Sequence, residues 1–283
     1  MSLIDMAIGG GSRPCSMRLD LDPGRPNESH VLDHVSKGIF YEPDVSNVFL
    51  RVLRDGDVAI DVGGNCGFFT MLAAALVGSR GRVLSVEPDP GNCARLRHNR
   101  DLNAFDHVSI IEQAAADKTG PVEFFINSDD SGGSAMWDPG QLPNNVKSRE
   151  APRKISLQAT TIDAEVVRSG VSEVKLIKID TEGAEHTVLR GASSLIASRR
   201  VPFVVCELHP FGLEKMGSSP SALRRHMGSF GYDSFMLFHD GSLPHLVPPE
   251  TVIQTKFICN ILFSTPYAVG SSWPHYLHEP KRS

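Results

Sequence analysis

Five side chains of this sequence combine acid, base or metal-binding chemistry with a position at the end of an apolar run. Asp61 and Glu87 end the first two such runs, and Asp180, Glu207 and His209 follow two later ones. Carboxylate and imidazole groups can hold ribose hydroxyls, accept protons or coordinate a divalent cation. Open α/β sheets bind ligands outside the carboxyl ends of their strands, so these positions are candidate site positions.

The stretch AIDVGGNCGFFT at 59–70 predicts a buried strand, a glycine-rich turn and the start of an apolar helix. Its glycines do not have the G-x-G-x-x-G spacing of dinucleotide sites. Asp61 at the strand end would repel a pyrophosphate and suits a cationic ammonium group. Glu87, twenty positions after Gly67, can hold two ribose hydroxyls. S-adenosylmethionine (SAM) carries an ammonium, a sulfonium and a ribose, so it is the predicted cofactor. The alternative, an ordinary strand-to-helix turn, is disfavoured by the pair Glu87-Pro88.

The later acidic groups suit the acceptor side of a methyl transfer. Such a transfer is an in-line displacement, and a protonated alcohol needs a base or a metal ion to assist it. Asp180 is the first candidate for this role, and His209 is the second because its ordinary pKa of about 6.5 suits proton acceptance. Alternatively, Asp180, Glu207 and His209 hold Mg²⁺ or Mn²⁺, or Glu207 and His209 only bond to neighbouring loops. Glu182 and Glu185 favour the first turn of the following helix, and capping is the preferred role for Glu185.

The elements that must position these groups alternate along the chain. Apolar runs predict strands, and periodic or capped segments between them predict helices, an order typical of an α/β fold with a doubly wound, mostly parallel sheet. The expected strands are 58–62, 82–87, 108–112, 122–126, 155–160, 174–179, 203–206, 234–238 and 252–263, the last two pairing antiparallel at the sheet edge. The expected helices are 45–53, 70–77, 90–103, 162–168, 184–189 and 219–229.

The chain divides into one large domain with added segments. Residues 1–40 are expected to form an irregular lead, 41–265 the main domain, and 266–283 a C-terminal tail. The polar segment 127–153 interrupts the alternation of strands and helices but contains Met136 and Trp137. Loops of this length are usually functional or disordered, which leaves two interpretations: a lid contacting the ligand through Trp137, or a disordered surface insertion.

Composition excludes several classes of protein. The 283 residues carry a net charge of −5 and no block of Lys and Arg, which argues against a nucleic-acid partner. The five cysteines form no C-x-x-C pair, which favours free thiols in a reducing compartment. No apolar run reaches membrane-spanning length, and the N-terminus has no charged region followed by a long apolar one. The prediction is a cytoplasmic protein acting on a small molecule, with a homo-oligomer left open.

Four motifs together carry a resemblance to a known family. IDVGGNCGFFT, VEP, IKIDTEGAEHTVLRGA and CELH resemble the FkbM family of SAM-dependent methyltransferases, the third being the most specific, and the similarity runs from about Tyr41 to Leu237. The family commonly has Ala where this chain has Gly64. The resemblance implies a Rossmann-like class I methyltransferase fold of seven strands with the last one antiparallel. It also implies O-methylation of a hydroxyl, often on a sugar, glycolipid or polyketide.

The motif GIFYEP at 38–43 resembles the segment that precedes the first strand in this family, so Tyr41 and Glu42 are expected to border the cofactor. The full set of expected cofactor residues is Tyr41, Glu42, Asp61, Gly63, Asn65, Gly67, Glu87, Pro88 and Ala115.

Two other classes compete with this interpretation. A nicotinamide-dependent short-chain reductase would use a Tyr-x-x-x-Lys pair, and none of the four tyrosines has Lys four residues later. A non-catalytic protein that binds SAM or a nucleoside would share the cofactor residues, and the acidic groups near Asp180 count only mildly against it.

Overall fold

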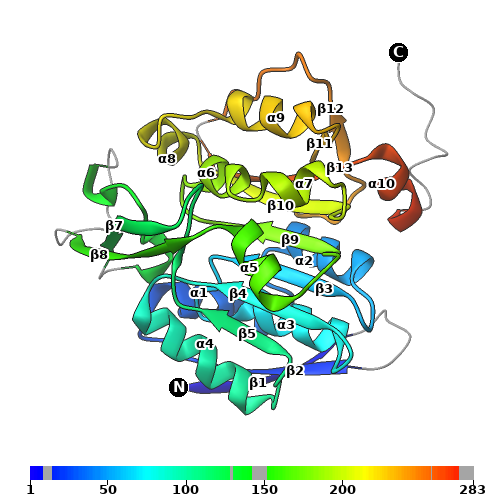
Figure 1. Ribbon diagram of the computed structural model, residues 1–283. Coiled ribbons are helices and arrows are strands. Elements are labelled where there is room, and N and C mark those ends of the chain that lie inside the picture. Colours follow the sequence, from blue (N-terminus) through cyan, green and yellow to red (C-terminus); the bar gives the residue numbers. More distant parts are fainter. Residues whose placement is uncertain (9–14, 128–129, 142–151, 256, 274–283) are drawn as a thin grey trace.

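A computed structural model describes residues 1–8, 15–127, 130–141, 152–255 and 257–273 (Figure 1). Its main sheet has the strand order β12-β11-β13-β10-β9-β3-β4-β5, with β5, β4, β3, β9 and β10 parallel to one another. The strands are β3 (Val58–Val62), β4 (Arg82–Val86), β5 (Val108–Ile111), β9 (Leu176–Ile179), β10 (Phe203–Leu208), β11 (Asp233–Met236), β12 (His245–Val247) and β13 (Cys259–Ser264). The predicted α/β fold with a mostly parallel sheet is confirmed.

The last long strand, β13, runs antiparallel between β10 and β11, so the predicted antiparallel final pair is confirmed. Two details differ from the prediction. The strand begins at Cys259 and not at Val252, which is largely exposed and lies in the connection after the two prolines at 248–249. A short strand, β12, pairs with β11 and adds an eighth member at the edge.

Helices cover both faces of this sheet, and the alternation of side chains along each strand supplies a core to each face. Ala59 packs with one buried cluster and its neighbour Ile60 with the other, as do Leu176 and Ile177. The helices are α1 (Pro26–Val35), α2 (Pro43–Val52), α3 (Phe68–Val77), α4 (Pro90–Leu102), α5 (Ile162–Ser169), α6 (Glu185–Arg190), α7 (Ser193–Ala197), α8 (Pro210–Lys215), α9 (Pro220–Ser229) and α10 (Pro266–Ser272).

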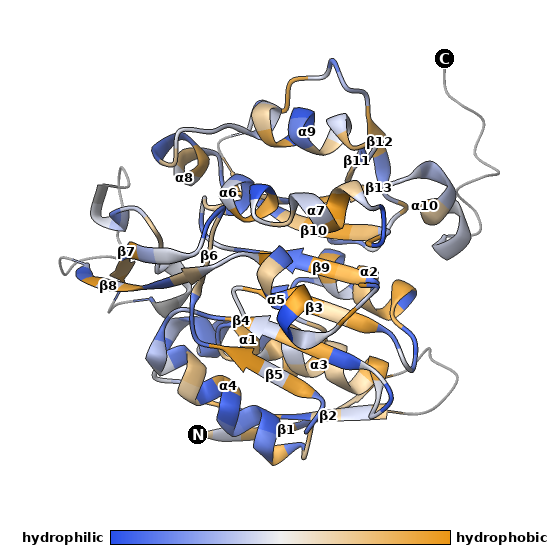
Figure 2. Ribbon diagram, in the orientation of Figure 1, coloured by the Kyte–Doolittle hydropathy of each residue, from blue (hydrophilic) through white to orange (hydrophobic). Residues whose placement is uncertain are grey.

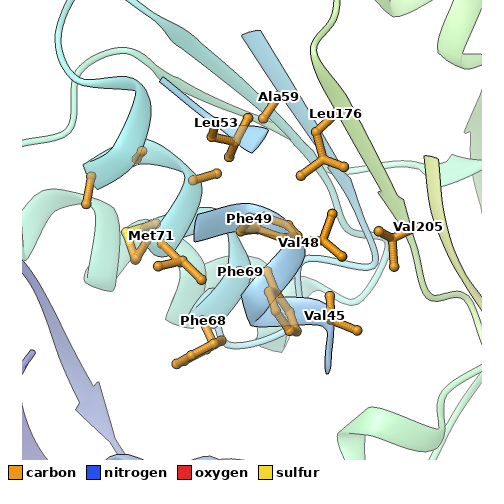
Figure 3. Packing of buried hydrophobic residues seen from close by; sticks show 14 of the residues in the cluster. Val45, Val48, Phe49, Leu53, Ala59, Phe68, Phe69, Met71, Leu176 and Val205 are labelled. Carbon is orange, nitrogen blue, oxygen red and sulfur yellow. The ribbon is translucent and has the colours of Figure 1, made fainter. Parts of the chain in front are cut away.

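Apolar residues of α2 and α3 pack against the sheet directly beside the glycine turn. Figure 3 shows Phe49 of α2 and Phe69 of α3 together beneath the strands, with ring centroids 5.1 Å apart. Hydrophobic colour runs along β3 and β5, whereas the outward-facing α4 is largely hydrophilic (Figure 2). The packing fixes the start of α3, and therefore the turn that precedes it.

Residues 1–40 were expected to form an irregular lead, and this prediction is wrong. β1 (Ser2–Ile8) and β2 (Cys15–Leu21) form an antiparallel hairpin, and α1 follows. Met17, Leu19 and Leu21 alternate with polar residues and are fully buried in the core that contains α3. The polar and glycine-rich composition of the segment hid this period-two pattern, which gives the hairpin its inner face.

The expected strands at 122–126 and 155–160 exist but leave the main sheet. β7 (Gly120–Ile126) and β8 (Arg153–Thr160) join β6 (Ala114–Ala115) in a separate three-stranded sheet, with β8 in the middle. The described part of the predicted insertion contains two 3₁₀ turns, η1 (Ser131–Gly133) and η2 (Pro139–Gln141). Residues 128–129 and 142–151 of that insertion lie outside the described residues.

The first part of the expected C-terminal tail belongs to the core. Val269 of α10 and Trp273 are buried in the cluster that contains α2 and α3. The remaining tail, 274–283, lies outside the described residues. Among the helices that the structure describes, none combines the length and apolar character needed to cross a membrane.

Candidate active site

A cavity lies at the carboxyl ends of the parallel strands and is lined by the loops that follow β3, β4 and β9 and by a residue of β10 itself. Its walls include residues 63–66, 87–88 and 180–182, together with Glu207. Tyr41, Glu42 and Ala115 also line it. The structure therefore brings together nine of the residues selected from the sequence: Tyr41, Glu42, Gly63, Asn65, Glu87, Pro88, Ala115, Asp180 and Glu207. Asp61, Gly67 and His209 do not line this cavity.

The glycine turn packs closely between β3 and the end of β9. Gly63 has φ +86°, and a Cβ at this position would overlap the carbonyl oxygen of Asp180. Gly67 has φ +100°, and its Cβ would come within 2.7 Å of Leu96 Cδ1. Only glycine accommodates both the backbone conformation and the close approach. The role of Gly67 is therefore to begin α3 on the α4 side of the turn, away from the cavity.

Glu87 holds the turn in place. One carboxylate oxygen, Oε2, accepts a hydrogen bond from the Asn65 amide at 2.8 Å, and Oε1 accepts one from the Asp89 amide at 2.9 Å. Burial raises the pKa of Glu87 to about 7. The two hydrogen bonds favour the ionised form and oppose this rise, but burial has the larger effect. Each carboxylate oxygen can accept more than one bond, so Glu87 can still bind hydroxyl groups from the cavity.

Asp61 lies behind the cavity wall and not on it. Its Oδ2 accepts a 2.6 Å hydrogen bond from Thr70 Oγ1, and its Oδ1 lies 4.0 Å from Lys178 Nζ. The carboxylate that faces the cavity on this side is Glu42. Burial, and then the negative charge of Asp180, raise the pKa of Glu42 to about 7.

Three carboxylates gather where β9 and β10 end. Oxygens of Asp180, Glu182 and Glu207 all lie within 4.8 Å of one another. Asp180 Oδ2 accepts a 2.8 Å hydrogen bond from Lys178 Nζ. Glu207 Oε2 is buried without a hydrogen-bond partner among the described residues, and burial and the neighbouring carboxylates raise the Glu207 pKa well above its ordinary value. Clustered carboxyl oxygens of this kind suit a cationic or hydroxyl-bearing ligand, and the raised pKa of Glu207 lets its protonated form donate a hydrogen bond as well.

His209 is the N-cap residue of α8, and its ring contacts Glu182, one of these three carboxylates. Its Nδ1 accepts a 2.8 Å bond from the Gly212 amide, which leaves Nε2 as the protonated nitrogen of a neutral ring. Nε2 lies 3.4 Å from Glu182 Oε2, and burial lowers the pKa of the imidazole. The structure therefore brings His209 to Glu182 but not to the cavity.

Trp137 connects the predicted insertion to the same loop. Its ring is buried against His209 and Phe211, with centroids 6.0 and 5.5 Å away, and its Nε1 donates a 2.6 Å bond to Glu182 O. Met136 lines the cavity beside it. These contacts show how the described part of the insertion borders the site, and its role as a lid stays a prediction.

Two glutamates that follow Asp180 have different roles. Glu185 is fully buried and lies in the first turn of α6, as predicted, but it makes no side-chain capping bond to the helix: its Oε1 accepts bonds from the Thr181 and Gly183 amides of the preceding loop, at 3.2 and 2.7 Å. Glu182 does not cap the helix with its side chain but lines the cavity. It has φ +54°, a strained conformation that it shares with two other lining residues, Glu42 and Asn65.

Lys178 is the main residue that sequence reasoning missed. It lies in the middle of the apolar run LIKI, where a charged side chain is unusual, and it is two positions before Asp180. Residues two apart in a strand share a face, so this spacing was a signal that Lys178 would face the same pocket.

Comparison with known proteins agrees with these features. Residues 61–234, more than half of the chain, match the model described as the methyltransferase FkbM domain. The hexuronic acid methyltransferase AglP of Haloferax volcanii is 28% identical over 59% of this chain and 62% of its own length. The 2-O-methyltransferase NoeI of Sinorhizobium fredii is 27% identical over 50% of this chain and 60% of its own.

A third relative matches over a longer stretch. The 31-O-demethyl-FK506 methyltransferase FkbM of Streptomyces tacrolimicus is 26% identical over 72% of this chain and 86% of its own. The chain spans about three fifths of the length of AglP and NoeI. The glycine turn, Glu87 and the IKIDTEGAE strand end all lie inside the matched domain, and the chain belongs to the FkbM family of methyltransferases.

Proposed function

We propose that this protein is an enzyme that transfers the methyl group of SAM to a hydroxyl of a sugar, glycolipid or polyketide-type small molecule. One observation carries the proposal: the glycine turn with Glu87 and the carboxylates of Asp180, Glu182 and Glu207 line a single cavity. The relatives are named as methyltransferases of a hexuronic acid and of oxygens on other molecules, which supports a hydroxyl acceptor.

In this proposal the ligand extends across the ends of three neighbouring strands. Glu87 after β4 accepts hydrogen bonds from the ribose hydroxyls, and the turn after β3 lies beneath the sugar. The acceptor hydroxyl lies beside Asp180, Glu182 and Glu207, which orient it for in-line attack on the methyl carbon. Asp180, at the end of β9 and paired with Lys178, accepts the hydroxyl proton. His209 acts by holding Glu182 and not as the base.

Incubation with labelled SAM and a panel of glycosides, glycolipids, polyketides and cell extract tests this proposal. A labelled hydroxyl product is the expected result. Asp180→Asn should bind SAM with nearly unchanged affinity in calorimetry yet lose turnover. Binding of SAM without transfer to any acceptor would instead support the non-catalytic SAM-binding protein, and full activity of Asp180→Asn would place the base elsewhere.

A divalent cation is a second proposal for the same oxygens. The predicted ligand set Asp180, Glu207 and His209 changes, because His209 Nδ1 is engaged and Glu182 takes its place. Three carboxylates within 4.8 Å suit Mg²⁺, which prefers oxygen ligands, although Lys178 already compensates one of them. When bound, the ion would polarise the acceptor oxygen. Chelation should then abolish turnover and Mg²⁺ restore it, whereas unchanged turnover in chelator would remove the ion from the proposal.

The small size of the acceptor is part of the same proposal. Cytoplasmic location and the absence of a nucleic-acid partner stay predictions from composition, and the sequence leaves a homo-oligomeric state open.

A further inference from the structure

Lys178 places a buried positive charge on the wall of the cavity. The residue is 4% exposed, and its Nζ lies 2.8 Å from Asp180 Oδ2 and 4.0 Å from Asp61 Oδ1. The ammonium also lies 4.7 Å from the centre of the Phe69 ring. An ammonium has three N–H donors, and the hydrogen bond to Asp180 uses one of them.

The positive charge of Lys178 contrasts with the acidic residues that line the rest of the cavity. Among the described lining residues, Lys178 is the sole Lys or Arg, whereas five acidic residues share the walls: Glu42, Glu87, Asp180, Glu182 and Glu207. Lys178 is therefore the point on these walls where a ligand carboxylate is attracted.

SAM has one such carboxylate, on its methionyl end, and four amides of the glycine turn already have partners within the protein. The amides of Gly63 and Gly64 donate to Val86 O, that of Asn65 donates to Glu87, and that of Gly67 donates to Gly64 O. Four amides of the turn are therefore engaged within the protein. The Lys178 ammonium supplies the carboxylate with a charged partner that these four amides do not.

The strand order puts Lys178 on the methionyl side of the ligand. β3 lies between β4 and β9, so Glu87 and Lys178 stand on either side of the glycine turn. Two strand spacings separate them, about 10 Å in all. A ligand whose ribose is held at Glu87 must cross β3 to reach the acceptor side, and its methionyl end then lies toward β9.

We propose that the Lys178 ammonium binds the methionyl carboxylate of SAM and thereby selects SAM over analogues that lack this group. The inference rests on SAM as the cofactor of the proposed function, but it does not depend on the acceptor. Asp180 shares the ammonium, so Lys178 connects the cofactor carboxylate to the group that faces the acceptor.

Calorimetric titration with three ligands tests the proposal without any acceptor. SAM has the carboxylate and the ammonium, decarboxylated SAM has only the ammonium, and 5′-methylthioadenosine has neither. The wild-type protein should bind SAM about 10- to 100-fold more tightly than decarboxylated SAM, the range expected for one charge-assisted hydrogen bond. In Lys178→Met this ratio should fall to about one or below, since the acidic cavity then favours the more cationic ligand, while affinity for 5′-methylthioadenosine stays the same.

Lys178→Arg keeps a cation and should retain the preference for SAM. Lys175→Met is the matched control, because Lys175 lies at the opposite end of the sheet and its side chain contacts Phe203. If Lys178→Met does not fold, combining it with Asp61→Asn removes a buried carboxylate that the first change leaves without its ion pair, and the same ratio is measured.

An unchanged ratio in the Lys178→Met protein would overturn the proposal, even if both ligands bind more weakly, because a purely structural lysine would affect them equally. Failure of the wild-type protein to bind SAM at all is a different result. It would refute the proposed function itself.

Discussion

Gly63 offers a sharp test of how the turn and the acidic strand end are fitted together. Its φ of +86° is unfavourable for a residue with a Cβ, at a cost of about 1–2 kcal/mol. A methyl group there would also overlap the carbonyl oxygen of Asp180, whose amide is itself bonded to Val62 O. Overpacking against backbone adds roughly 1–3 kcal/mol. We therefore predict that Gly63→Ala lowers the free energy of unfolding by about 2–5 kcal/mol.

Gly170→Ala is the matched control for this change. Gly170 has φ +67° but no atom within 4 Å of a Cβ, so its substitution introduces the conformational cost without the contact. Urea unfolding of both variants and the wild type measures the difference, and calorimetry measures the affinity for SAM. Gly63→Ala should lose more stability than Gly170→Ala and also bind SAM more weakly, because the end of β9 must move away from the turn. Equal losses of stability in the two variants would refute the reasoning.

Three further predictions concern neighbouring groups. Glu87→Ala should weaken SAM binding at least tenfold in calorimetry, since it removes the acceptor for the ribose and the bond that holds the Asn65 amide; wild-type affinity would remove Glu87 from the cofactor site. Burial raises the pKa of Glu185 from 4.5 to about 7, so this carboxyl stabilises the folded state below about pH 4.5 and that contribution is lost as pH rises to about 7. Thermal unfolding of the ligand-free Glu185→Gln protein should therefore depend less on pH over this interval than that of the wild type, and an identical dependence would count against the shift. Trp137→Phe removes one buried hydrogen bond to Glu182 O and should cost about 1 kcal/mol of stability while reducing turnover more than SAM affinity; a loss confined to SAM affinity would contradict this.

The parts of the fold that could be predicted are those that local pattern encodes. The apolar runs around Asp61 and Asp180 are long enough to identify buried parallel strands, and their ends identify the ligand-binding edge. The hairpin at the N-terminus was missed because composition outweighed its alternation: Met17, Leu19 and Leu21 face inward, while the polar residues between them suggest a loop.

The side-chain partners in the site depend on pairing between distant strands. Asp61 lies opposite Lys178 in the register of β3 and β9, and this places its carboxylate behind the cavity wall. No local pattern contains that register. His209 likewise has a position typical of a catalytic base, but the turn into α8 uses its Nδ1 for a cap. The sequence could thus identify the edge of the sheet at which the reactive side chains lie, but not which of those side chains face the ligand.

The position of β13 has a practical consequence for work on fragments. The matched family domain ends at residue 234, whereas β13 comes from 259–264 and fills the space between β10 and β11. A fragment cut at 61–234 would leave an unpaired edge on β10, together with a truncated β11 and the exposed apolar side chains that Leu262 and Phe263 normally cover. It would also lack Tyr41 and Glu42 from the cavity wall. We expect such a fragment to aggregate and to show no cooperative unfolding transition, so expression boundaries for this chain should follow the sheet and not the family match.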